Sequence, residues 1–302
     1  MTTQRRGFLY GVGAYLLWGL FPLYWPLLKP AGAVEILSHR VVWSLLTMSV
    51  VLLASHRVAQ FRAIFASPRT RRLLSLAAVT IAMNWGTYIY GVNHHKVVET
   101  SLGYFINPLV TVLMGVLILG ERLRPWQWVA VGIASLAVVG LAIEYGRPPW
   151  IALILAFSFG TYGLAKKQAG VESVESLSFE TLVLAPLAGG FLIWAGTTGH
   201  SHFLGHGAGH SALLALTGVV TAVPLMCFGA AAIRVQMTTL GLLQYLAPVI
   251  QFVLGVTLLD EQMTPMRWVG FGLVWVALVI FTWESLHFRR SQLLLAAEAS
   301  AL

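Results

Sequence analysis

The sequence predicts an all-α polytopic membrane protein of ten transmembrane helices, arranged as two inverted five-helix repeats. Three observations lead to this prediction: the scarcity of charged residues, the positions of the few charges, and an internal repeat. Only 10% of the 302 residues are charged, against about 25% in an average soluble domain. Hydrophobic residues make up 58% of the chain and the mean hydropathy is +0.78. A soluble fold cannot bury that much apolar surface in one core, so the chain is expected to lie in a lipid bilayer.

Uncharged stretches longer than 15 residues mark the candidate spans in order, since a membrane helix needs about 17 to 25 mostly apolar residues. They cover residues 7–28, 41–56, 73–95, 100–120, 125–143, 148–165, 181–233, 235–259 and 268–283. The seventh is long enough for two spans around the polar, glycine-rich stretch 196–211, which gives ten. The stretches lack the in/out alternation of a barrel strand, so helices are expected. The first ends in Pro22, Pro26 and Lys29 without a cleavage pattern, which favours a span over a signal peptide.

The basic residues orient these spans. If the N-terminus is cytoplasmic, fourteen Lys and Arg residues fall on that side, including the cluster Arg57, Arg62, Arg69, Arg71 and Arg72, and four fall on the other side. The positive-inside rule therefore predicts that both termini are cytoplasmic. This distribution accounts for the net charge of +8, so nucleic acid is not expected as a partner.

An internal repeat appears at an offset of 140 residues. Residues 93–141 and 233–281 share twelve identities in 49 positions without a gap, among them Glu121 with Glu261 and Trp128 with Trp268. The loop that follows the fourth span carries Arg122 and Arg124, whereas the equivalent positions after the ninth span are Gln262 and Thr264. The loop after the ninth span thus lacks the basic residues of its counterpart, as expected if it lies on the opposite side of the membrane. This difference indicates that the second repeat is inverted relative to the first.

Two repeats of five spans define the expected organisation: 1–145 as the first unit, 146–285 as the second, and 286–302 as a cytoplasmic tail. An odd number of spans per repeat turns the second copy upside down in the membrane. Inverted helical repeats are typical of secondary transporters, whose site lies near the midplane between the repeats and is exposed alternately to each side.

Polar and aromatic residues inside the spans are the candidates for a substrate site, because a polar group in lipid needs a partner. In the fourth span, Tyr104 and Asn107 recur on one helical face just before Pro108. In the ninth span, Gln244 and Tyr245 precede Pro248 in the same way. A proline frees a backbone carbonyl one turn earlier, and a neighbouring amide binds either that carbonyl or a substrate. Packing between helices around a kink is the alternative explanation.

Four charged or titratable residues within or at the margin of the spans are candidate coupling residues: Glu35, His39, Arg40 and Glu180. Glu35 and His39 are four residues apart and Arg40 adjoins them, so the start of the second span is expected to neutralise its own charges. A substrate-carboxylate or proton site is the functional alternative. Glu121 and Glu261 are expected to interact with the N-terminal dipole of the helix that follows each.

Enzyme and metal chemistry have little support in the sequence. The phosphate-binding loop G-x4-G-K-[ST] and the motifs H-E-x-x-H and G-x-S-x-G are absent, so no enzyme activity, ATP-driven pumping or cofactor is expected. The four histidines between His200 and His210 lie in a Gly/Ser-rich segment without carboxylates, which is typical of a solvated loop rather than a metal site. The single cysteine, Cys227, excludes a disulfide framework.

Several motifs resemble those of the RarD-type EamA transporters of the drug/metabolite transporter superfamily. They are Glu35-Ile-Leu-Ser-His39-Arg40-x-x-Trp43-Ser44, Asn84-Trp85, Ser101-Leu-Gly-Tyr-Phe-Ile-Asn-Pro-Leu109, Gly120-Glu-Arg-Leu123, Phe157-Ser-Phe-Gly-x-Tyr-Gly163 and Gln244-Tyr245-x-x-Pro248. The resemblance covers residues 7–281. It implies a bacterial inner-membrane location, a link to chloramphenicol sensitivity or metabolite movement, and a central cavity built by spans 1, 3, 4, 6, 8 and 9. On this chain that cavity would be lined by Trp18, Asn84, Tyr88, Tyr104, Asn107, Tyr162, Thr221, Gln244 and Tyr245.

The expected function is that of a secondary transporter or facilitator of a small amphipathic metabolite or drug. The expected partners are that small-molecule substrate and the lipid bilayer. The alternative is a non-transporting membrane accessory or scaffold protein; polar residues that face a cavity favour the transporter. An intramembrane enzyme would need a reactive cluster, and the sequence contains no recognisable one. The substrate, the direction of transport and the oligomeric state are not predicted.

Overall fold

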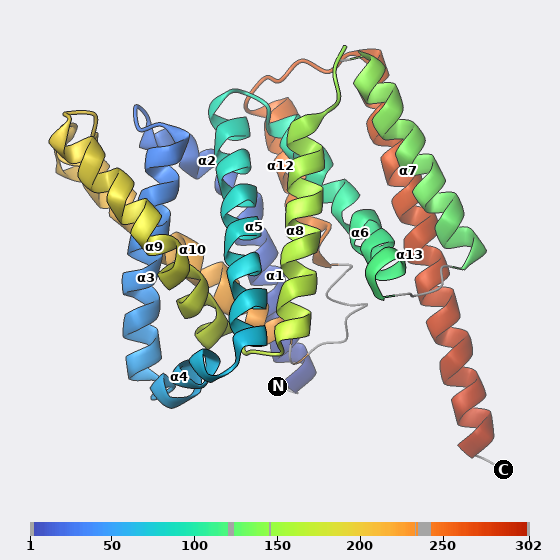
Figure 1. Ribbon diagram of the computed structural model, residues 1–302. Coiled ribbons are helices and arrows are strands. Elements are labelled where there is room, and N and C mark those ends of the chain that lie inside the picture. Colours follow the sequence, from blue (N-terminus) through green and yellow to red (C-terminus); the bar gives the residue numbers. More distant parts are fainter. Residues whose placement is uncertain (1–2, 120–123, 145, 233, 235–242, 301–302) are drawn as a thin grey trace.

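The computed structural model describes residues 3–119, 124–144, 146–232, 234 and 243–300 (Figure 1). In this part of the chain all regular structure is helical. The helices are α1 (Thr3–Gly19), α2 (Phe21–Tyr24), η1 (Trp25–Leu28), α3 (Ala33–Ala54), α4 (Val58–Ala66), α5 (Pro68–Asn93), α6 (Val97–Leu119), α7 (Pro125–Glu144), α8 (Trp150–Ala169), α9 (Ser173–Thr197), α10 (Gly207–Ala232), α12 (Leu246–Thr257) and α13 (Pro265–Ser300).

Seven segments among the described residues are long and apolar enough to cross a membrane. They are Arg5–Leu28, Ala33–Ala54, Pro68–Asn93, Pro125–Glu144, Ser173–Thr197, Gly207–Phe228 and Pro265–Glu284, and two shorter apolar helices cover Trp150–Lys166 and Leu246–Thr257. The protein is therefore polytopic and helical, as predicted, while the count of ten spans stays a prediction. Of the predicted spans, the ninth is described only from residue 243 onward.

The basic loop after the second span contains a helix that the sequence analysis did not predict. Helix α4 follows Arg57 and buries Ile64 against Leu74 of α5 and Phe179 of α9. The arginines that flank this short segment, Arg57, Arg69, Arg71 and Arg72, concealed its apolar face. The loop is therefore partly ordered against the bundle.

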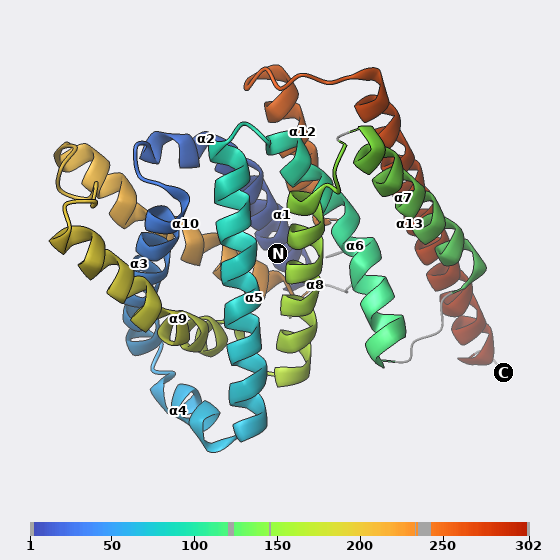
Figure 2. The same ribbon diagram turned by 45° about the horizontal axis from the view of Figure 1, so that its top comes forward.

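The helices pack mainly across the two halves of the sequence. Helix α3 contacts α9 and α10, α5 contacts α8 and α9, α1 contacts α10 and α12, α6 contacts α8 and α12, and α7 contacts α13. The α7–α13 pair lies on one side of the bundle, and α3 and α9 lie on the opposite side in both views (Figure 2). Helices α5, α8, α1, α6 and α12 lie between them.

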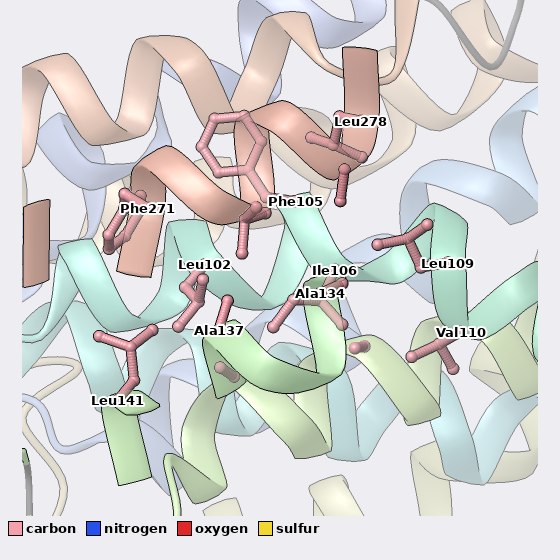
Figure 3. Packing of buried hydrophobic residues seen from close by; sticks show 14 of the residues in the cluster. Leu102, Phe105, Ile106, Leu109, Val110, Ala134, Ala137, Leu141, Phe271 and Leu278 are labelled. Atoms are coloured by element: carbon pink, nitrogen blue, oxygen red, sulfur yellow. The ribbon is translucent and has the colours of Figure 1, made fainter. Parts of the chain in front are cut away.

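The pairing of α7 with α13 is antiparallel and is fixed at both ends. Arg124, just before α7, donates to Glu284 near the far end of the pair (2.6 Å), while Thr264, just before α13, donates to Glu144 at the end of α7 (2.7 Å). Between these ends the apolar cluster of α6, α7 and α13 includes Leu102, Phe105, Leu141 and Phe271, all at most 2% exposed (Figure 3).

Small residues allow close helix crossings, as is common in membrane bundles. A Cβ atom at Gly218 of α10 would lie 2.4 Å from the carbonyl carbon of Trp43 in α3. A Cβ atom at Gly103 of α6 would lie 2.8 Å from the carbonyl oxygen of Ala152 in α8. Glycine at these two positions lets the helices that surround the centre of the molecule approach each other.

Candidate functional site

A central cavity lies among α1, α2, α3, α5, α6, α8, α10 and α12, and the space not filled by atoms, open solvent at its margin included, is about 630 Å³. Seven of the lining side chains are aromatic and most of the others are apolar or neutral polar. The lining residues are Tyr15, Trp18, Phe21, Arg40, Ile81, Asn84, Trp85, Tyr88, Tyr104, Asn107, Phe159, Leu225, Gln244, Ala247, Pro248 and Gln251.

Asn84 holds three helices together at one wall of this cavity. Its Nδ2 donates to the carbonyl of Leu155 (3.0 Å) and to Ser158 Oγ (3.1 Å), both in α8. Its Oδ1 accepts from the hydroxyl of Tyr104 in α6 (3.0 Å). The amide is thus fully engaged, so Asn84 positions the Tyr104 ring rather than presenting free donors.

Gln251 bonds to a backbone carbonyl that a proline leaves free. The carbonyl of Trp18 would normally accept from the N–H four residues later, but that residue is Pro22, which has none. Gln251 Nε2 donates to this carbonyl instead (3.0 Å). The bond ties α12 to the end of α1 and fixes the position of the Gln251 amide at the cavity wall.

Three oxygen atoms in the cavity wall are buried and have no hydrogen-bond partner among the described residues. They are Tyr88 Oη, Asn107 Oδ1 and Gln251 Oε1. A buried polar atom without a partner costs about 1–3 kcal/mol. These atoms are placed to bind water or a ligand in the cavity.

Arg40 is the one charged residue among the described lining residues. Its side chain is 2% exposed and its Nε donates to Thr221 Oγ1 of α10 at 2.7 Å. The guanidinium carbon lies 4.0 Å from the centre of the Trp85 ring and 5.1 Å from that of Trp25. Aromatic faces stabilise a buried cation without neutralising it.

Six of the nine residues predicted for the site line the cavity: Trp18, Asn84, Tyr88, Tyr104, Asn107 and Gln244. The other three do not. Tyr162 donates to Glu180 (3.2 Å) in a separate buried cluster. Thr221 accepts a hydrogen bond from Arg40 Nε, and Tyr245 packs against the apolar cluster of α6, α7 and α13.

The candidate coupling residues separate into three environments. Glu35 accepts from the backbone N–H of His202 (2.7 Å) and contacts its Nδ1 (2.6 Å). His39 stacks on Phe203 with ring centres 4.8 Å apart. The expected local neutralisation of Arg40 by Glu35 is wrong: five residues along a helix turn the side chain by about 140°, so Arg40 faces the cavity while Glu35 faces the loop of His202.

Glu180 belongs to a buried cluster between α8 and α9. Its carboxylate accepts from Ser176 Oγ (2.6 Å) and forms an ion pair with Lys166 (3.2 Å). Lys166 also donates to the hydroxyl of Tyr162 (2.9 Å). The charge of Glu180 is therefore compensated outside the central cavity.

Four lining residues were not among those predicted for the site, namely Tyr15, Phe21, Trp85 and Gln251, and Arg40 was predicted only as a candidate coupling residue. Of these, Gln251 carries a signal in the sequence, since it lies one turn beyond Pro248 on the face of Gln244. The aromatic residues could not be separated from core residues by spacing alone. Among the described residues, no group of three His, Cys, Asp or Glu side chains is placed to hold a metal ion.

Comparison with known proteins gives matches over the whole chain. Residues 5–143 and 148–283 each match the EamA-like transporter family. The chain is 59% identical to Protein RarD from Streptomyces exfoliatus, over 98% of this chain and 94% of that protein. It is 40% identical to the uncharacterized transporter YojE of Bacillus subtilis (strain 168), over 95% and 97%. A solved crystal structure, 19% identical, superposes with a TM-score of 0.60 and covers 93% of this chain and 98% of that one, which supports the fold alone.

Proposed function

The chain belongs to the EamA-like transporter family and, through its RarD relatives, to the drug/metabolite transporter superfamily; we propose that it is a secondary transporter or facilitator that moves a small amphipathic molecule across the bacterial inner membrane. Transport proceeds by alternating access between the two halves. The observation that carries this proposal is the central cavity, whose walls come from both halves of the chain. An accessory or scaffold protein has no need of a central cavity lined by amides, hydroxyls and a buried arginine.

The inverted-repeat arrangement is part of the proposal and is supported by the contacts between helices. If the first five spans are exchanged with the last five, the contact of α5 with α8 becomes that of α10 with α1, and the contact of α6 with α8 becomes that of α12 with α1. The polar contacts at the two ends of the α7–α13 pair exchange in the same way, since 124 and 264, and 144 and 284, are each 140 residues apart. We assign residues 1–145 and 146–285 to the two five-span units and 286–302 to a tail.

Two polar contacts between the halves, one at each end of the bundle, support the proposal of alternating access. Glu35, at the start of α3, bonds to the loop of His202 between α9 and α10. Glu175, at the start of α9, forms an ion pair with Arg57 between α3 and α4 (3.0 Å). Each contact joins the two halves at one end of the bundle, so release of one contact with retention of the other would open the cavity to one side.

The test is uptake of a panel of metabolites and antibiotics into proteoliposomes that contain the purified protein, with protein-free liposomes as the baseline. We expect saturable uptake of at least one compound and a loss of about tenfold or more in the variants Asn107→Ala and Gln244→Ala. The matched control is Leu187→Ala in α9, whose side chain is 79% exposed toward lipid. Uptake that is absent for all compounds, or equal in all variants, would contradict the proposal.

Proton coupling is a separable part of the proposal and rests on Glu35, His39 and Glu180. The same proteoliposomes are assayed with and without an imposed pH gradient. Uptake that the gradient accelerates, and that Glu180→Gln makes insensitive to it, supports coupling. Equal uptake under both conditions assigns facilitated diffusion instead.

A further inference from the structure

The charge of Arg40 is not neutralised within the described protein. The side chain is 2% exposed, and its position in the eighth residue of α3 places it about two helical turns into the bundle. No carboxylate of the described residues lies within 4.0 Å of its guanidinium; Glu35 pairs with His202, and Glu180 pairs with Lys166. An uncompensated arginine inside a membrane costs about 2.5–3.5 kcal/mol or more, so an arginine that only filled space here would be costly.

The contacts of Arg40 hold its side chain in place without using all its donors. Thr221 accepts from Nε, and the rings of Phe21, Trp25 and Trp85 lie 5.7, 5.1 and 4.0 Å from the guanidinium carbon. A guanidinium has five N–H donors, and its two terminal nitrogens form a fork that matches a carboxylate. The packing therefore fixes a preorganised cation at the wall of the cavity.

The other polar groups of the cavity are neutral. Asn84, Asn107, Gln244, Gln251, Tyr88 and Tyr104 supply amides and hydroxyls, and no Asp, Glu, Lys or His is among the described lining residues. The cavity therefore carries one positive charge. In a low-dielectric site one carboxylate neutralises that charge, whereas a phosphate dianion or a zwitterion would each leave one charge without a partner.

We propose that the central cavity binds an organic monocarboxylate whose carboxylate pairs with Arg40. The seven aromatic side chains of the wall favour a ligand with an apolar or aromatic body. The unpartnered acceptors Asn107 Oδ1 and Gln251 Oε1 favour a ligand that also carries a hydroxyl or N–H donor, and the unpartnered Tyr88 hydroxyl can donate or accept. This inference rests on the proposed function, because it takes the central cavity as the transport site.

The first experiment measures binding to the purified full-length protein in detergent, by the shift in melting temperature and by tryptophan fluorescence. The probes are carboxylate and carboxamide pairs of matched shape, from lactate and lactamide to 3-phenyllactate and 3-phenyllactamide. Phenyl phosphate serves as the dianion and phenylalanine as the zwitterion. We expect 3-phenyllactate to bind at least about tenfold more tightly than its amide, which is the contribution of one hydrogen-bonded charge pair, and more tightly than the dianion or the zwitterion.

Variants of Arg40 separate recognition from structure. Arg40→Met is expected to abolish the preference for carboxylate over amide, and Arg40→Lys to retain it with weaker binding, since the charge remains but the fork is lost. The melting temperature of Arg40→Met without ligand is expected not to fall, because the variant removes an uncompensated buried charge. Arg62→Met, which removes a charge from exposed α4, is the control and is expected to keep the wild-type preference.

The outcomes are distinct for the two proposals. The inference is overturned if no carboxylate binds better than its amide, or if Arg40→Met keeps the preference for carboxylate over amide. It is also overturned if a lower melting temperature is the only effect of Arg40→Met. Uptake of a neutral compound that does not depend on Arg40 would overturn the inference and leave the transporter in place. Arg40-dependent carboxylate binding without any uptake in proteoliposomes would support the anion site and remove the proposed function.

Discussion

Glu261 closes the N-terminal end of α6 from a distant part of the chain. Its carboxylate accepts from the backbone N–H groups of Val97 and Val98, the latter at 2.8 Å. From the sequence, Glu261 was expected to interact with the helix that follows it, α13, and this expectation is wrong. The loop after α12 instead lies against the first turn of α6, where free N–H groups and the helix dipole favour a carboxylate.

A pH dependence follows from the burial of this carboxyl. Burial raises the pKa of Glu261, and the hydrogen bonds from Val98 and Val97 oppose the shift without cancelling it. A carboxyl whose pKa is raised on folding stabilises the protein below its unfolded pKa, near 4.3, and this contribution is lost as the pH rises through the folded pKa. We expect the melting temperature of the wild type, relative to Glu261→Gln, to fall as the pH rises above about 4 and through the raised pKa of Glu261. Asp260→Asn, at the exposed neighbouring position, is the control; a difference that stays constant or rises would refute this sign.

At the residue scale the sequence predicted polar faces better than it predicted partners. Helical spacing brought Tyr104 and Asn107 to one face, and both line the cavity. Partners depend on helices that are distant in the sequence. The hydrogen bond of Gln251 with the Trp18 carbonyl, for example, joins residues 233 positions apart. Local spacing has no information about such pairs.

Helices α3 and α9 begin with the same short pattern, V-E-x-L-S, at residues 34–38 and 174–178. In both, the serine donates to the valine carbonyl one turn earlier, at 2.8 and 2.7 Å. In both, the glutamate binds the loop of the other half, through His202 for Glu35 and through Arg57 for Glu175. The two segments are 140 residues apart and so belong to the repeat that relates 93–141 to 233–281, but five residues were too short a match to be recognised.

These two contacts predict opposite effects on access to the cavity. In a Cys227→Ser background, a single cysteine at Gln244 reports access through its rate of labelling by an impermeant maleimide. Loss of one partly exposed ion pair shifts a two-state equilibrium by up to about 1 kcal/mol, or about fivefold. We expect Glu35→Gln to raise labelling from the side of the His202 loop and Glu175→Gln to raise it from the side of α4. Gln60→Ala in α4 is the control, and equal effects on both sides would show that the contacts are not gates.

The crossing of α3 and α10 predicts a stability effect that depends on a single methyl group. A Cβ atom at Gly218 would lie 2.4 Å from the Trp43 backbone, so the two helices must move apart. We expect Gly218→Ala to cost about 1–3 kcal/mol, measured as a lower melting temperature in detergent. Gly189→Ala in α9 adds the same methyl where nothing lies within 4 Å, and we expect a change of less than about 1 kcal/mol. Equal melting temperatures for the two variants would contradict the close crossing.

At the scale of the whole molecule, composition and charge predicted the class of fold, because a bilayer imposes one rule on every span. Each span needs a sufficient length of apolar residues, and this requirement does not determine which helices pack against each other. The pairing of α7 with α13, for example, depends on Arg124 and Glu284 at one end and on Thr264 and Glu144 at the other. The sequence repeat aligned positions 124 and 264, but it gave no reason to place the two helices in contact. Contacts between repeats arise from packing in three dimensions, which one-dimensional periodicity does not encode.

The sidedness of the molecule is the remaining prediction at this scale. Helix α4 and the described ends of α1 and α13 lie at one end of the bundle, and the loop between α9 and α10 lies at the other (Figure 1). Because the arginines around α4 favour the cytoplasm, a cysteine at Gln60 is expected to react with an impermeant maleimide only after the membrane is disrupted. A cysteine at Leu204, 83% exposed in the opposite loop, is expected to react in intact cells. The Cys227→Ser parent supplies the background, and the reverse pattern would place both termini outside and exchange the sides of the membrane assigned to the Glu35 and Glu175 contacts.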